Sequence, residues 1–332
     1  MFPTRRIVIG GAIALATAAL AVQTGAAEAP KRISLDWAYY NPVSLVLKEK
    51  SWVEQEFKKD GIEIRWVQSH GSNKALEFLN AGAIEFGSSA GAAALLAKIN
   101  GTPIQAIYVY SKPEWTALVT RPKSGIKTVA DLKGKRVAVT RGTDPYIFLL
   151  RALAGAGLSE KDIRPVLVQH ADGRTALERG DVDAWAGLDP MMAETEVEKG
   201  SVLFFRNADA NTYGVLNVRE AFAKEHPELV IRVLRQYERG RKWALANPGE
   251  LRDILAKAAR LSDPVSAKQL ERTDFADPLI GEKPHASILA AGIALQKSGV
   301  IEEKVDVKAV TDALLNPAFA RETLKRDQAQ AR

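Results

Sequence analysis

The same pattern of residues occurs twice in this chain. Residues 79–86 and residues 177–184 both follow the pattern L-x-x-G-x-[IV]-[DE]-x. Each copy predicts a helix that ends at a glycine, Gly82 or Gly180, because glycine adopts the left-handed conformation of a helix C-terminal cap without strain. A short apolar strand is expected to follow at once. Two copies of this unit favour an α/β protein with two similar lobes, although single units of this kind occur in many α/β proteins.

Each predicted strand opens into a loop of small or polar residues. These loops are expected at residues 87–91 and residues 185–190. Ligands of open α/β sheets bind at the carboxyl ends of the strands. The sequence therefore predicts two ligand-facing loops, one in each lobe.

Strands and helices alternate along the rest of the chain, which favours mostly parallel sheets covered by helices. Further strands are expected at residues 33–37, 62–67, 104–110, 115–120, 136–140, 166–169, 202–205 and 213–217. The strand–helix pattern starts again near residue 120, which predicts that one lobe is inserted into the other. We expect residues 28–118 with 209–318 to form lobe 1, residues 119–208 to form lobe 2, and residues 319–332 to be a loose C-terminal tail.

The first 27 residues have the pattern of a secretory signal peptide. Arg5 and Arg6 precede a charge-free apolar run over residues 7–22, and small residues follow at 25–27. A membrane anchor is the alternative, but the run is shorter than the ~20 residues that a spanning helix needs. Cysteine is absent, so disulfides and a cysteine-linked lipid are excluded. We expect export to the periplasm, removal of residues 1–27 and no lipid anchor; the arginine pair leaves open which export route is used.

The composition excludes several classes of function. Hydrophobic content of 46% and charged content of 26% are typical of a globular protein. The net charge of +6 is spread along the chain without a basic block interleaved with aromatics, which argues against nucleic acid. No nucleophile elbow, P-loop or dinucleotide fingerprint is present, and the four histidines are scattered. We therefore expect no enzyme activity, catalytic residue, metal or cofactor, and each histidine on the surface.

Three predicted helix starts offer groups that bind anions. Asp144 is placed to cap a helix with Pro145 in its first turn, Ser88 and Ser89 precede another helix, and Asn41 precedes a third. The N-terminus of a helix exposes free N–H groups and the positive end of the helix dipole. Several such ends in one cleft would hold an oxyanion, whereas a single cap is usually only structural.

Aromatic residues stand beside the predicted strand ends. They can wall a pocket for an apolar ligand body, or pack in the core. Trp185 is the strongest candidate because it begins the second predicted loop. The set consists of Tyr39, Tyr40, Trp115, Tyr146, Trp185 and Tyr213.

Residues 181–190, D-V-D-A-W-A-G-L-D-P, resemble the V-D-A-W-x-x-x-D-P signature of periplasmic aliphatic-sulfonate-binding proteins of ABC importers, which belong to the nitrate/sulfonate/taurine substrate-binding family. Residues 126–135, I-K-T-V-A-D-L-K-G-K, and the first repeat agree with this family. The resemblance implies a type II periplasmic-binding-protein fold, in which two α/β lobes are joined by a two-strand hinge and hold the ligand between them.

The resemblance also implies which residues contact the ligand. With the aromatic candidates, the expected binding set is Tyr39, Tyr40, Asn41, Ser88, Ser89, Trp115, Thr143, Asp144, Tyr146, Trp185, Asp189 and Tyr213. One departure concerns the turn at 143–145, where sulfonate binders usually have serines. A carboxylate facing an anion is repulsive, so either Asp144 turns inward as a cap or the ligand carries a cation, as taurine does.

These observations predict a monomeric periplasmic receptor that captures a small organic anion, foremost an aliphatic sulfonate, and delivers it to an ABC permease and ATPase in the inner membrane. Taurine, a sulfate ester, nitrate or a small carboxylate stay open as ligands. A ligand-sensing module for a membrane kinase is another alternative. Pyrimidine-precursor synthases share the fold family but need a cysteine-rich segment, which this chain lacks.

Overall fold

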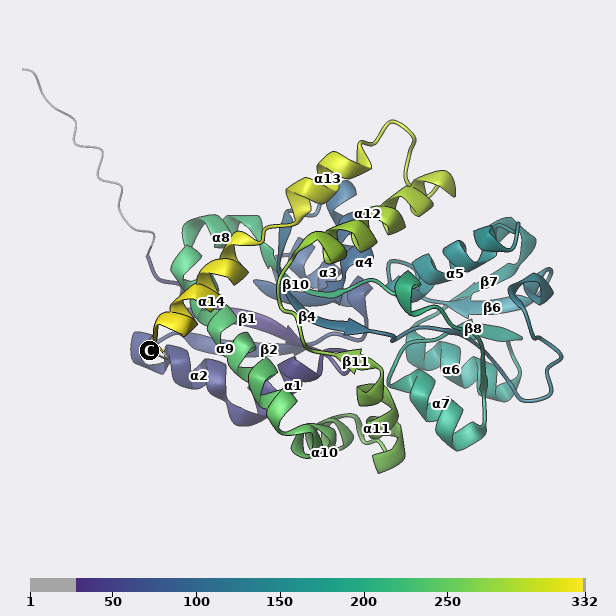
Figure 1. Cartoon of the computed structure of the whole chain (residues 1–332), viewed down its shortest axis with the longest axis horizontal. Helices are drawn as coiled ribbons and strands as arrows, with labels where there is room; N and C mark the ends of the chain where they lie inside the picture. Colours follow the sequence, from purple (N-terminus) through teal and green to yellow (C-terminus); the bar gives the residue numbers. More distant parts are fainter. Residues whose placement is uncertain (1–27, 331–332) are drawn as a thin grey trace, which may run out of the picture.

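Two β-sheets organise the chain, and the computed structural model describes residues 28–330 (Figure 1). The expected signal peptide lies outside these residues. The first sheet has the strand order β11-β4-β10-β3-β1-β2, with bounds Thr273–Asp274, Ile104–Pro113, Gly214–Arg219, Phe86–Ala90, Arg32–Trp37 and Glu63–Gln68. The second sheet has the order β7-β6-β8-β5-β9, with bounds Arg164–Leu167, Arg136–Val139, Ala184–Ala186, Leu118–Thr120 and Val202–Phe205. The expected α/β architecture with two lobes is confirmed.

Helices surround both sheets. Those of the first lobe are α1 (Pro42–Lys50), α2 (Trp52–Phe57), α3 (Ser72–Asn80), α4 (Gly91–Ile99), α8 (Glu220–Glu225), α9 (Pro227–Ala246), α10 (Pro248–Ala259), α12 (Glu282–Lys297), α13 (Val307–Leu314) and α14 (Ala318–Gln330). Those of the second lobe are α5 (Asp144–Gly155), α6 (His170–Arg179) and α7 (Met191–Lys199), which lie together on the right of Figure 1. Helix α11 (Asp263–Glu271) contacts both α10 and α7, so it touches a helix of each lobe.

Both sheets are mixed, whereas the sequence pattern favoured mostly parallel sheets. β1 runs parallel to β2 and β3, and β6 runs parallel to β7 and β8. The antiparallel pairs involve β10 with β3 and β4, and β5 with β8 and β9. The difference arises because β4, β5, β9 and β10 carry the chain from one sheet to the other and back.

The two repeat glycines occupy the conformation that the sequence predicts. Gly82 has φ of 67° just after α3, and Gly180 has φ of 87° at the C-terminal cap of α6. Both values lie in the left-handed region, where a side chain is strained. The prediction of two helices that end at glycine is confirmed.

The expected ligand loop at residues 87–91 is wrong, because most of these residues form strand β3. Ser88 and Ser89 pair with Leu216 and Val215 of β10 inside the first sheet. A Cβ atom at Gly87 would lie 2.8 Å from Leu79 Cδ1, so only glycine lets α3 approach this strand so closely. Small residues here therefore serve close packing rather than an open loop. Trp185 likewise lies within β8, not in a loop.

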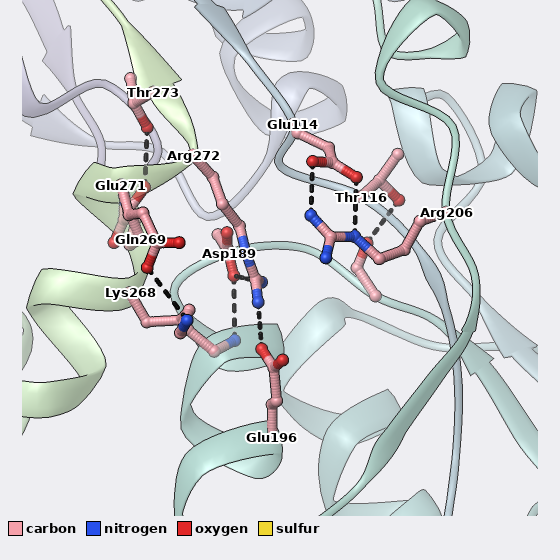
Figure 2. A network of polar contacts seen from close by, with 12 residues as sticks. Glu114, Thr116, Asp189, Glu196, Arg206, Lys268, Gln269, Glu271, Arg272 and Thr273 are labelled. Carbon is pink, nitrogen blue, oxygen red and sulfur yellow. Dashed lines mark hydrogen bonds and ion pairs between the residues drawn. The ribbon is translucent and has the colours of Figure 1, made fainter.

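Two segments cross between the lobes, and they are linked to each other. Glu114, between β4 and β5, accepts two hydrogen bonds from Arg206, between β9 and β10, over 2.9 and 2.6 Å (Figure 2). Asn211 Oδ1 accepts a hydrogen bond from Thr116 N over 2.9 Å. These contacts hold the two crossings side by side.

The C-terminal tail is helical instead of loose. Residues from Ala318 to Gln330 form α14, which lies against α9. Arg326 pairs with Glu228 of α9 at 2.6 Å and with Glu322 of its own helix at 2.7 Å. Arg326 of this tail therefore has an acidic partner on the folded lobe. Among residues 28–330 no helix is both long and apolar enough to cross a membrane.

Candidate ligand-binding site

A cavity of about 630 Å³ lies between the two lobes. The first lobe contributes Tyr39, Tyr40, Ser69, His70, Lys74 and Phe78. The second lobe contributes Gln169, His170, Ala171, Arg174, Asp189, Pro190, Met191 and Glu194, and the end of α10 adds Ala259 and Leu261. Many of these residues follow the carboxyl ends of β1, β2, β7 and β8, where open α/β sheets bind ligands.

Tyr40 is held in the first-lobe wall by its hydroxyl group. Its Oη donates a hydrogen bond to Ser88 O over 3.0 Å and lies 3.0 Å from Ser69 Oγ. Behind it, Asn41 caps α1 through Ser44 N and donates from Nδ2 to Ser88 Oγ over 2.8 Å. Tyr40 therefore lines the cavity, while Asn41 and Ser88 position it from the buried side.

Asp36 lies beneath this wall as a fully buried carboxyl group. Its oxygens accept hydrogen bonds from Ser69 Oγ over 2.6 Å and from Ser88 N and Oγ over 2.8 Å each. Burial raises the pKa of Asp36 to about 7, although the three hydrogen bonds favour the ionised form. The carboxyl group thus links the ends of β1, β2 and β3 below the cavity floor.

Asp189 joins the second-lobe wall to the chain that follows α11. Its Oδ1 accepts a hydrogen bond from Ala193 N over 2.9 Å and lies 3.5 Å from Arg272 Nη1. Arg272 also pairs with Glu196 of α7, as Figure 2 shows. Burial raises the pKa of Asp189 to about 7, against the opposing charge of Arg272. The pair ties the two lobes together at the edge of the cavity.

His170, the first residue of α6, is only 1% exposed, so its expected surface position is wrong. Burial lowers the pKa of His170 to about 3, which keeps the ring neutral. Thr140 Oγ1 donates its proton to Val168 O over 2.7 Å and lies 3.3 Å from His170 Nδ1, so Nδ1 carries the hydrogen of the ring. The other ring nitrogen, Nε2, has no hydrogen-bond partner among residues 28–330.

Charged side chains of the cavity wall are paired. Arg174 forms an ion pair with Glu194, which also lines the cavity. Lys74 pairs with Glu77 one helical turn away, at 2.7 Å. Among the described lining residues, each lysine and arginine therefore already has a carboxylate partner.

Asp144 turns away from the cavity. Its carboxylate accepts hydrogen bonds from Trp115 Nε1 over 2.9 Å, Thr212 N over 2.9 Å and Thr212 Oγ1 over 2.7 Å. Trp115 and Thr212 lie in the two segments that cross between the lobes. Burial raises the pKa of Asp144, while these donors oppose that shift. The residue expected to cap α5 is its first residue instead, with Thr143 at the cap position, and it connects α5 to both crossings.

The cavity brings together only part of the predicted binding set. Tyr39, Tyr40 and Asp189 line it, and Asn41, Ser88, Trp115 and Asp144 support it from behind or from the crossings. The remaining five lie elsewhere. Three form hydrogen bonds within the protein: Ser89 with Asn217, Thr143 with Thr140 O, and Tyr146 with Glu160. Tyr213 lies by Lys112 in another hollow, and Trp185 is fully buried.

Several lining residues were missed by the sequence analysis, notably Ser69, His170 and Met191. The same rule that selected Tyr39 would have found Ser69 and His170, because residues 69–70 follow β2 and residues 169–170 follow β7. His170 was not considered because the histidines were expected on the surface. Ala259 and Leu261 carried no signal, because only the folded chain brings the end of α10 to the cavity.

A protein-family model described as NMT1/THI5 like matches residues 46–251, more than half of the chain. The chain belongs to the NMT1/THI5-like family. Two relatives of this NMT1/THI5-like chain are named as aliphatic sulfonates-binding proteins. The one from Escherichia coli (strain K12) is 26% identical over 309 residues, covering 91% of this chain and 94% of the relative. The one from Bacillus subtilis (strain 168) is 27% identical over 271 residues, covering 81% and 82%.

The NMT1/THI5-like fold also matches solved structures. One is the alkanesulfonate-binding protein SsuA from Xanthomonas axonopodis pv. citri bound to MOPS, with 25% identity and a TM-score of 0.77, covering 85% of this chain and 98% of that one. The family resemblance read from residues 181–190 is therefore confirmed, and these relatives are named as binding proteins.

Proposed function

We propose that this chain is the substrate-binding protein of an ABC importer and that it captures a small organic oxyanion, an aliphatic sulfonate, between its lobes. The observation that carries the proposal is the cavity lined by strand ends of both sheets. The names of the Escherichia coli and Bacillus subtilis relatives support the ligand class. Closure of two lobes over a ligand is a common hinge motion of such receptors.

The electrostatics of the wall are compatible with an anion held by N–H and O–H groups. Lys74 and Arg174 are neutralised by acidic partners, so neither supplies an unpaired charge. Helix α6 begins at the wall with His170, and the first N–H groups of a helix favour negative charge. A sulfonate has three oxygens that accept such bonds.

The remaining parts of the proposal concern the setting of the protein. Residues 1–27 act as an export signal, and the mature chain works as a monomer in the periplasm. It is not anchored by a cysteine-linked lipid, since it has no cysteine. Residues 28–118 and 209–318 form the lobe that carries the first sheet, and residues 119–208 form the inserted lobe. The closed form is presented to a permease and its ATPase.

Isothermal titration of residues 28–332 with ethanesulfonate, taurine, methyl sulfate and nitrate tests the binding function. A matched pair of variants locates the site. Ala171 lies exposed in the cavity, so Ala171→Trp should fill it and abolish binding. Ala286 is equally exposed on α12 outside the cavity, so Ala286→Trp should leave binding unchanged. No heat with any oxyanion, or equal loss in both variants, would contradict the proposal.

A further inference from the structure

The cavity is much larger than a two-carbon sulfonate or nitrate requires. Its volume of about 630 Å³ lies within the range of roughly 300–1,000 Å³ that is typical of pockets for drug-sized ligands. A ligand with a short chain would leave most of this space to water. The dimensions therefore fit an anion that carries a substantial body.

Three apolar side chains in the wall come from three separate elements. Phe78 lies on α3 in the first lobe, Met191 on α7 in the second lobe, and Leu261 just after α10. None of the three is fully buried in the structure, so each still has surface that a ligand can cover. When an apolar ligand body covers such surface, the surface is removed from water, and this stabilises the complex.

Several polar groups of the same wall are already bonded within the protein. Arg174 and Glu194 neutralise each other, and Tyr40 directs its hydroxyl group to Ser88 and Ser69 behind the wall. Ala171, Pro190 and Ala259 add further apolar surface without hydrogen-bonding side chains. The wall therefore combines this apolar surface with the hydrogen-bonding groups of Tyr39, His70 and Gln169.

We propose that the ligand is an oxyanion with a bulky apolar body, a long-chain alkyl or aryl sulfonate, and that Phe78, Met191 and Leu261 grip this body from both lobes. This inference rests on the proposed function, because it takes the sulfonate head group as given. It makes taurine and nitrate poor ligands, since neither has an apolar body to cover these side chains.

Titration of residues 28–332 with ethane-, butane-, hexane- and octane-1-sulfonate tests the inference. Each added methylene should tighten binding about fourfold, equivalent to about 0.8 kcal/mol, until the cavity is filled. Equal affinities along the series would overturn the inference and leave the proposed function intact. Octan-1-ol, which has the body but no anion, should bind far more weakly; if it binds as tightly as octane-1-sulfonate, the proposed function fails instead.

A variant pair checks that the wall itself produces the trend. Leu261→Ala should weaken octane-1-sulfonate at least fivefold and ethanesulfonate less than twofold, because only the longer chain reaches this side chain. Leu245→Ala, at a half-exposed position of α9 outside the cavity, should change neither. A loss of affinity in Leu261→Ala that is the same for both ligands would contradict the assigned role.

Discussion

Arg272 Nη1 lies 3.5 Å from Asp189 Oδ1, with both side chains almost fully buried between the lobes. Glu196 on α7 supplies a second carboxylate to the same guanidinium group (Figure 2). The contact joins the chain after α11, which continues into the first sheet through β11, to the strand end of β8. Arg272 is therefore placed to hold the two lobes together in the arrangement of this structure.

Arg272→Met should lower the free energy of unfolding by about 3 kcal/mol, because removing one partner of a buried ion pair leaves an uncompensated charge. It should also increase the radius of gyration of the ligand-free protein, measured by small-angle X-ray scattering, as the lobes separate. Lys268→Met is the matched control, since Lys268 pairs with Glu271 on the exposed side of α11. An unchanged radius in Arg272→Met would contradict the role in closure.

Asp144→Asn should destabilise the protein by about 1–3 kcal/mol. Three buried groups donate to the two carboxylate oxygens, and an amide offers them only one oxygen as an acceptor. Ligand affinity should stay within about threefold, a free-energy change below about 0.7 kcal/mol, because the carboxylate does not line the cavity. Urea unfolding and calorimetric titration measure the two effects separately. If Asp144 faced the anion, removing its charge would tighten binding instead, and that result would contradict the structure.

Trp185→Ala should cost about 3–5 kcal/mol of stability, since a fully buried tryptophan leaves a large cavity in the core. The ring lies so close to α6 that a Cβ atom at Gly173 would be 2.7 Å from Trp185 Nε1. Gly173→Ala should therefore destabilise by overpacking, and Trp185→Phe should be milder than Trp185→Ala. Thermal and urea unfolding test the order, and a stable Trp185→Ala protein that only loses ligand would contradict it.

The free energy of unfolding should depend on pH because of Asp36. Its pKa rises from 3.8 to about 7 on folding, so the folded state holds the proton more tightly than the unfolded chain. As pH rises from about 4 to 7, the unfolded chain ionises first, and the free energy of unfolding should fall before levelling off. Urea unfolding at several pH values measures this slope.

Asp36→Asn should flatten the slope, because the amide does not titrate and still accepts from Ser88. Part of the slope should persist, since burial shifts the pKa of Asp189 in the same direction. A slope identical to that of the unaltered protein would show that Asp36 is ionised throughout this range.

Local signals in the sequence were sufficient for the glycine-terminated helices. Gly82 and Gly180 depend only on the backbone conformation after α3 and α6, which nearby residues determine. The repeated pattern at residues 79–86 and 177–184 likewise led to two α/β lobes. Tyr39 and Tyr40 were found because they stand beside a strand end, where such folds bind ligands, and Asp189 was found from the family resemblance of residues 181–190.

Local sequence patterns could not predict which of the candidate residues are buried. Trp185 and Ser89 follow the same strand-end rule, but their neighbours in the sheet and on α6 come from distant parts of the chain. His170 was set aside as a surface residue because histidines are often exposed, whereas the ring is covered by the opposite lobe. The helical tail was missed because its acidic partner Glu228 lies far back in the sequence.

Gly71 follows β2 at the point where the first lobe meets His170. A Cβ atom there would lie 2.8 Å from Asn73 Oδ1 and 3.1 Å from His170 Nε2, so the lobes come this near only because the residue has no side chain. Alanine and then valine at this single position would place side chains of increasing size against His170, and the spacing between the two lobes is expected to increase in the same order.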